Sequence, residues 1–365
     1  MTSKGHRRFL CLSSGFTRHN PGPQADTTRR SPGAKPGPIR DPGAQPAGWG
    51  RDIKANQGGS FMSCGSQEEH WRTFYESAWH ERAQYINDLI EAGEHSIVRC
   101  INKLRAKERR FVLIAEEDCS ALSWRPKFNV TATGYLPSGV PINTSRSLEG
   151  QPARIPFYTN PALTEFILDF YFEAGPYDAV IELGSGLGAS LFETYYAGLP
   201  ADLPLFGGEL TESGVALSRR LAALDAHLNA VFFHFDHLAA DLSIIKERKF
   251  EKVLVYTSHS IEQVEAVPLS FFREIAACAP SVTVLHLEPF GFQVRATTPS
   301  RVEQQQLFRQ NRWNNNLVSA LDEAVQEGIC RKEWVSLDTF IPVDTCNSTS
   351  LLVWTNIPSE TGSET

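Results

Sequence analysis

The sequence has no apolar run long enough to cross a membrane. Its longest apolar stretches, residues 161–172 and 281–292, are interrupted by charged residues, whereas a spanning helix needs about 18–20 consecutive apolar residues. Near the N-terminus only residues 9–13 are weakly apolar, which is too short for the apolar core of a secretory signal peptide. We therefore expect neither a membrane partner nor secretion.

Cysteine is scarce and scattered. The seven cysteines are odd in number, and no two of them form a C-x-x-C pair. This pattern predicts neither a disulfide framework nor a zinc knuckle. It is typical of a protein of the reducing cytoplasm, and a cytoplasmic location is expected.

Positive charge is scarce beyond the first 60 residues. Residues 1–60 carry ten Lys and Arg against three Asp and Glu, while residues 61–365 carry 25 against 39, a net charge of −14. Binding to the phosphate backbone of nucleic acid requires clustered Lys and Arg. We therefore expect no nucleic-acid partner.

Composition divides the chain into four segments. Residues 1–61 are basic, rich in Pro and Gly and without hydrophobic periodicity, so they are predicted to form a disordered tail. A transit peptide and an upstream extension of a reading frame that starts at Met62 are the alternatives. Residues 62–157 are expected to form a cap of helices and mixed strands, residues 158–357 the main domain, and residues 358–365 a second disordered tail.

The cap begins with a helical pattern. Apolar side chains recur at three- and four-residue steps, which predicts one or two helices over residues 68–109. The members of this stripe are Trp71, Phe74, Tyr75, Trp79, Ala83, Ile86, Leu89 and Ile90. Further on, Asn160 and Pro161 mark the start of a helix that ends near Glu173.

The main domain alternates short strands with helices. Its strands are continuously apolar, which indicates burial on both faces and hence a parallel sheet covered by helices. Five such strands are predicted, at residues 178–183, 205–210, 230–235, 252–257 and 281–287. Helices are expected between them, near residues 189–197, 214–228, 238–246 and 267–278, with a further one at 317–327. Two last strands, at 334–342 and 350–355, are close enough to form an antiparallel hairpin.

A glycine-rich loop comes after the first of these strands. It reads Gly184-Ser185-Gly186-Leu187-Gly188 and leads into a helix, where glycines let backbone amides approach a ligand. The same residues, with Ala189, also satisfy the dinucleotide pattern G-x-G-x-x-G/A. An NAD-dependent oxidoreductase is therefore an alternative, and an ordinary tight turn is another.

Three features disfavour the dinucleotide. Glu182, two residues before the loop, would repel a pyrophosphate and suits a cationic ligand. Glu209 ends the next strand about 20 residues after the loop, where a carboxylate can accept both hydroxyls of a ribose. The closing hairpin is also foreign to NAD-binding folds.

The motifs E-L-G-S-G-L-G, G-E-L and F-D-H, in this order and spacing, resemble those of class I S-adenosylmethionine-dependent methyltransferases. The resemblance spans residues 178–355 and implies an α/β fold: a seven-stranded Rossmann-like sheet with a C-terminal antiparallel hairpin, here with an N-terminal helical cap. It implies S-adenosyl-L-methionine as the cofactor. In that case Glu182, Gly184, Gly186 and Gly188 border its methionine end, Glu209 holds the ribose and Asp236 the adenine amine.

Ser185, in the loop, and Thr257, at the end of the fourth strand, complete the predicted cofactor set. The two acids at the ends of strands also permit a purely structural role. Glu209 precedes Thr211, and Asp236 precedes a predicted helix, so either carboxylate could serve only as a helix cap.

The residues after the fourth strand predict the kind of acceptor. The [N/D]-P-P-[Y/F] box with which this superfamily commonly methylates amines is absent, and the sequence there reads T-S-H-S-I-E-Q. His259 can act as the base that hydroxyl methylation generally needs, although a capping or cofactor-contacting role is equally open. Glu288, at the end of the fifth strand, is the second catalytic candidate, and His286 is expected in the core. O-methylation is favoured.

The phrases S-H-S-I-E-Q, L-E-P-F-G-F-Q and R-W-N-N-N-L are similar to bacterial small-molecule methyltransferases, some of which act on sugars. A small-molecule acceptor is therefore expected, in a pocket that residues 295–316 cover together with the helices at 68–109, unless residues 295–316 form a solvated loop. A degenerate methyltransferase that serves only as an interaction module is a further alternative.

The residues His234, Asp236, His237 and His259 raise the question of a metal site. Because side chains alternate along a strand, those of His234 and His237 point in a different direction from that of Asp236. The sequence also shows no pattern of further residues that would hydrogen-bond to metal ligands and orient them. The sequence therefore predicts no metal.

Overall fold

The computed structural model describes residues 67–115, 122–126, 143–148, 151–156, 161–340 and 348–357. All of these residues belong to one compact unit, Ala44–Thr365. The two predicted tails, residues 1–61 and 358–365, lie outside the described residues.

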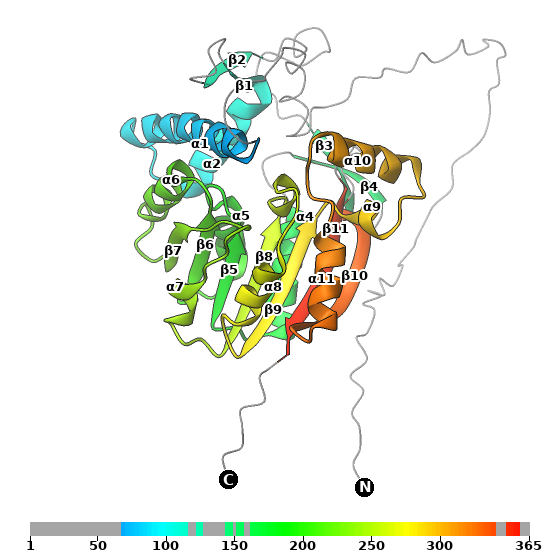
Figure 1. Ribbon diagram of the computed structural model, residues 1–365. Helices are drawn as coiled ribbons and strands as arrows, with labels where there is room; N and C mark the ends of the chain where they lie inside the picture. Colours follow the sequence, from blue (N-terminus) through cyan, green and yellow to red (C-terminus); the bar gives the residue numbers. More distant parts are fainter. Residues whose placement is uncertain are drawn as a thin grey trace, which may run out of the picture. The chain divides into compact units, whose positions relative to one another are not determined.

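The main domain is built on a seven-stranded sheet with the order β10-β11-β9-β8-β5-β6-β7 (Figure 1). The strands are β5 (Ala179–Leu183), β6 (Leu205–Glu209), β7 (Ala230–His234), β8 (Lys252–Ser258), β9 (Ser281–Glu288), β10 (Cys330–Phe340) and β11 (Thr349–Asn356). Strands β5 to β9 are parallel, and β11 is antiparallel to both β9 and β10. The predicted parallel sheet with its closing hairpin is confirmed, and with it the fold class that the methyltransferase resemblance implied.

Helices cover both faces of this sheet. One face carries α4 (Pro161–Ala174), α5 (Ala189–Gly198) and α6 (Glu212–Ala222), and the other carries α7 (Ser243–Lys246), α8 (Leu269–Ala276) and α11 (Leu317–Gln326). Strand β8 shows why its sequence is continuously apolar. Val253 and Val255 lie in one core, while Leu254 and Tyr256 lie in the other, and all four are fully buried.

The N-terminal region contributes two helices, α1 (Gln67–Glu91) and α2 (Ile97–Arg110). Ser96 caps α2 by accepting a hydrogen bond from the Arg99 amide. Ile86 of α1 and Leu104 of α2 are buried in the same core as α5, so the helices predicted over residues 68–109 are confirmed and belong to the folded core. Two hairpins come next in the chain, β1 (Phe111–Ala115) with β2 (Leu122–Pro126), and β3 (Asn143–Leu148) with β4 (Gln151–Pro156).

Three predicted helices are shorter than expected, among them the one at 267–278, which the structure shows as α8 over Leu269–Ala276. The helix expected at 238–246 begins only at Ser243, because the Asp241 carboxylate accepts the Ser243 amide and the Glu274 carboxylate accepts the Leu242 amide, which stabilises the preceding turns. Helix α6 ends at Ala222 rather than residue 228.

The expected substrate cover, residues 295–316, is partly helical. Helix α9 (Gly291–Val294) precedes it, and α10 (Pro299–Gln310) occupies its middle. The Thr298 hydroxyl caps α10 by accepting the Arg301 amide, and Pro299 stands in the first turn, where its missing N–H costs nothing. The alternative of a solvated loop is therefore wrong for residues 299–310, which are helical.

Within the described part of the chain, no helix combines the length and the apolar character that crossing a membrane requires.

Candidate functional site

The glycine-rich loop lies between the carboxyl end of β5 and the start of α5. Gly184, Gly186 and Gly188 have φ angles of +81°, +56° and +81°, in the left-handed region that side chains disfavour. A Cβ on Gly186 would lie 2.8 Å from the Trp79 ring, and one on Gly188 would lie 2.7 Å from the Phe232 ring. Glycine is thus required by both conformation and space.

Glu209, the last residue of β6, is bonded directly to this loop. Its Oε2 accepts the Gly186 amide at 2.9 Å, and its Oε1 accepts the amide and the hydroxyl of Thr211 at 3.0 and 2.7 Å. Burial raises the pKa of this carboxyl. Since a carboxylate offers about four acceptor positions, one remains, which suffices for one ribose hydroxyl and not for both of those predicted. Glu209 therefore lies beside the helix start, as the capping alternative proposed, and also holds the loop.

Asp236 lies after β7 at the same edge of the sheet. Its Oδ1 accepts the Leu238 amide at 2.8 Å, and its Oδ2 forms an ion pair with Arg72 of α1 at 2.7 Å. The side chain is 12 % exposed. The carboxylate is therefore engaged by the N-terminal helix, and its contact with an adenine amine stays a prediction.

Glu182 lies inside the protein, on the face of the sheet that α5 covers. Its carboxyl faces Tyr256, Ser190 and the Leu191 amide, and its Oε2 has no hydrogen-bond partner. Burial raises its pKa to about 8, so the group is mainly protonated at neutral pH. Without a ligand the group therefore carries little negative charge, and its contact with a cationic cofactor stays a prediction.

We expect Glu182→Gln to stabilise the protein at alkaline pH. The folded chain keeps a proton on Glu182 that the unfolded chain releases, so the stability falls as the pH rises from about 4.5 to about 8. The amide removes this loss. The melting temperature of the variant should exceed that of the wild type by several degrees at pH 8.5 and approach it near pH 5. The exposed Glu91→Gln serves as control, and a difference that does not change with pH would contradict a protonated Glu182.

Ser185 and Thr257 are both buried. The Ser185 hydroxyl lies next to Gly207 and has no hydrogen-bond partner. The Thr257 hydroxyl pairs with Nδ1 of His286 at 3.0 Å, and Nε2 of His286 accepts the Trp354 indole N–H at 2.9 Å. His286 is thus the core residue that was predicted. Any contact of Thr257 with a cofactor would come from its backbone.

His259 lies after β8 at the carboxyl edge. Its Nε2 lies 2.6 Å from the Thr349 hydroxyl and its Nδ1 lies 3.4 Å from the Glu262 carboxylate, and its side chain is 33 % exposed. Its φ of +52° is uncommon for a non-glycine residue and is a feature found at functional sites. The structure therefore holds an imidazole at the open edge with a carboxylate on one nitrogen.

Glu288 supports the loop that carries His259. Its buried carboxylate accepts the amides of Ser260, Ile261 and Glu262 at 3.1 to 3.4 Å. Burial raises its pKa to about 7. These contacts favour a positioning role, whereas direct action on an acceptor stays a prediction.

The imidazoles of the suspected metal cluster are not grouped. Among the described residues, no three His, Cys, Asp or Glu side chains are close enough to hold an ion. His237 packs against Phe235 and Phe271, both of its ring nitrogens lack hydrogen-bond partners, and burial lowers its pKa to about 4. It is therefore a neutral, buried ring.

The sequence predicts that the helices at residues 68–109 help to cover the pocket, but not which of their residues reach the loop and Asp236. Trp79 was expected only in an apolar stripe, yet it lies on Gly186, and Arg72 was given no role although it reaches Asp236. The available signal was their spacing, because residues seven apart share one face of a helix. Thr349, the partner of His259, carried no signal.

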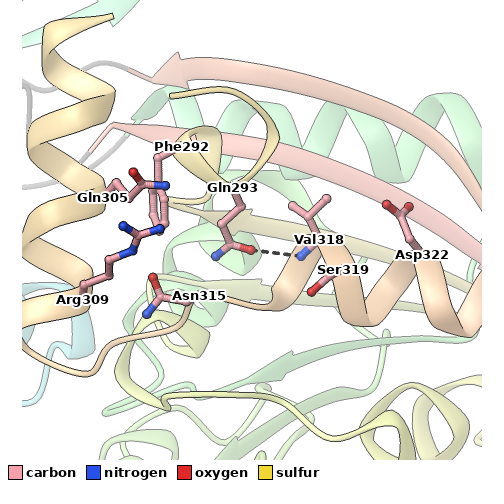
Figure 2. Close-up of a pocket in the computed structure, with 8 residues that line it drawn as sticks. All are labelled: Phe292, Gln293, Gln305, Arg309, Asn315, Val318, Ser319 and Asp322. Atoms are coloured by element: carbon pink, nitrogen blue, oxygen red, sulfur yellow. Dashed lines mark hydrogen bonds between the residues drawn. The ribbon is translucent and has the colours of Figure 1, made fainter. Parts of the chain in front are cut away.

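A separate cavity of about 470 Å³ lies where α9, α10 and α11 meet. Figure 2 shows Gln305 and Arg309 extending from α10 toward Phe292 and Gln293. The side-chain oxygen of Gln293 accepts a hydrogen bond from the Val318 amide. The cavity includes part of the expected substrate cover but none of the predicted cofactor or catalytic residues.

No family model matches the sequence, and no match is found among curated proteins. Among solved structures, the chain is similar to the magnesium protoporphyrin IX methyltransferase of Synechocystis PCC 6803 with bound SAH: 12% identity, 54% of this chain and 83% of that chain, TM-score 0.38. It is similar to a geranyl diphosphate methyltransferase in complex with GPP and sinefungin: 14% identity, 55% and 78%, TM-score 0.36. It is also similar to an O-methyltransferase family protein from Burkholderia thailandensis: 15% identity, 54% of this chain and 57% of that chain, TM-score 0.35.

Proposed function

We propose that this protein is a methyltransferase that uses S-adenosyl-L-methionine to methylate a hydroxyl group of a small molecule. The observation that carries this proposal is the bond between Glu209 and the Gly186 amide. This bond joins Glu209, the last residue of β6, to the glycine loop that follows β5. Asp236 lies after β7, the strand that pairs with β6. A nucleoside cofactor that reaches from Asp236 to the loop would meet Glu209 between them.

The residues fit such a cofactor at three points. Glu209 keeps one acceptor position for a ribose hydroxyl, and the carboxylate of Asp236 suits the adenine amine. The glycines let the chain approach the methionine end without side chains. When bound, the cofactor supplies a methyl group on a sulfonium, which reacts by direct displacement.

The protein's contribution to that step is mainly positioning. The acceptor oxygen must be held about 3 Å from the methyl carbon in line with the breaking bond. His259 would take the hydroxyl proton through Nε2, in exchange for its bond to Thr349, while Glu262 orients the ring through Nδ1. Glu288 fixes the backbone that carries both.

The direct test is incubation of the purified protein with a metabolite extract and methyl-labelled S-adenosylmethionine. We expect label to appear in a small molecule as a methyl ether. Label found only in protein or nucleic acid would contradict the substrate class, and no transfer beyond the heat-inactivated control would contradict the activity.

A further inference from the structure

One face of α1 is in contact with three parts of the proposed cofactor site. Arg72 pairs with Asp236, Glu76 binds the start of α6, and Trp79 lies on Gly186. Residues at i, i+4 and i+7 share one side of a helix. The face therefore runs along the row of predicted cofactor-binding residues from the Asp236 end to the glycine loop.

The middle of this face is firmly attached. The Glu76 carboxylate accepts the amides of Glu212 and Ser213 at 2.9 and 3.0 Å and also the Ser213 hydroxyl. It thereby satisfies N–H groups at the start of α6, where a negative charge is favourable. Glu76 is also close enough to Glu209 to add to the increase of its pKa. The helix is thus anchored next to the proposed ribose-binding acid.

Tyr75 extends the same surface. Burial raises its pKa, and the carboxylates of Glu262 and Glu209 raise it further. Tyr75 is three residues from Arg72 and four from Trp79, so it belongs to the same side of α1.

We infer that the α1 face formed by Arg72, Tyr75, Glu76 and Trp79 is the outer wall of the cofactor site, and that cofactor binding displaces Arg72 from Asp236. The inference rests on the proposed function. Oδ1 of Asp236 is already bonded to the Leu238 amide, and the Arg72 guanidinium occupies Oδ2. Because the Asp236 side chain is only 12 % exposed with Arg72 against it, an adenine amine that donates to this carboxylate must take the place of the Arg72 guanidinium.

The test is calorimetric titration of the full chain with S-adenosylhomocysteine, comparing wild type with Arg72→Gln. Removal of the competitor should tighten binding about two- to five-fold, the range allowed by a partly exposed ion pair. Raising the salt concentration should tighten wild-type binding, because it screens the pair, and should leave Arg72→Gln unchanged. The matched control is Arg220→Gln, which removes the exposed ion pair between α6 and Glu91 of α1 and should change neither affinity nor its salt dependence.

Trp79 gives an independent readout. Binding of S-adenosylhomocysteine should change the tryptophan fluorescence of the wild type, and Trp79→Phe should remove most of this change while it keeps an aromatic wall. The control Trp124→Phe, on β2, should preserve the change.

The outcomes separate the two claims. If the wild type binds S-adenosylhomocysteine but Arg72→Gln binds it equally or more weakly, the role of α1 is overturned and the proposed function is left intact. The same holds if Trp79→Phe keeps the full fluorescence change. Absence of binding by the wild type would overturn both.

Discussion

Replacement of His259 by alanine should lower the turnover of methyl transfer by about 10²–10⁴-fold and leave the affinity for S-adenosylhomocysteine nearly unchanged. A base that acts only on the acceptor contributes to the transition state and not to cofactor binding. The imidazole is partly exposed at the carboxyl edge of β8, and its Nε2 is held by a hydroxyl that an acceptor hydroxyl can replace. Single-turnover rates and calorimetry with the same preparation would measure both quantities.

Variants of its neighbours distinguish a base from a structural cap. Glu262→Gln should lower turnover by less than His259→Ala, because it weakens only the orientation of the ring. Thr349→Val should keep the fold and most of the activity if the acceptor replaces this hydroxyl during the reaction. If His259→Ala instead melts many degrees lower and retains its turnover per folded molecule, or loses cofactor affinity, the assignment as base is wrong.

Replacement of Glu209 by alanine should weaken cofactor binding by about 1–3 kcal/mol, roughly five- to 150-fold in Kd. The variant loses a charged acceptor for the ribose and also the bond that holds the Gly186 amide. Glu209→Gln should fall between the wild type and the alanine variant, since an amide oxygen still accepts from Gly186. Calorimetry would give the affinities, and melting temperatures would show whether each variant is folded.

Thr211→Val is the matched control for this prediction. It removes the hydroxyl that bonds to Glu209 and caps α6, but leaves the carboxylate in place. We expect this variant to lose stability and to keep most of its cofactor affinity. Equal affinity of wild type and Glu209→Ala, both folded, would show that Glu209 is only a cap.

The elements of the main domain could be predicted because their signals are local. Strand β8 is apolar at every position that faces either core, and a parallel sheet necessarily brings the residues after β5, β6, β7 and β8 to one edge. The glycine loop, Glu209, Asp236 and His259 were therefore expected at one site, and the structure places each of them at the end of its strand.

The remaining features depend on contacts between distant segments. The protonated state of Glu182 requires Tyr256 and α5 to exclude water from it, and no pattern around residue 182 indicates this. His259 meets Thr349 across 90 positions of sequence, and Arg72 meets Asp236 across 164. Periodicity could predict that Trp79 faces inward, but it could not predict that the partner is Gly186.

The most direct test of the proposed cofactor is a calorimetric competition between S-adenosylhomocysteine and NAD for the purified protein. The bond between Glu209 and the glycine loop, the adjacent Asp236 and the closing hairpin predict micromolar binding of S-adenosylhomocysteine that NAD does not reduce. Tight binding of NAD, with no binding of S-adenosylhomocysteine, would contradict the proposed methyltransferase and favour an oxidoreductase built on the same loop.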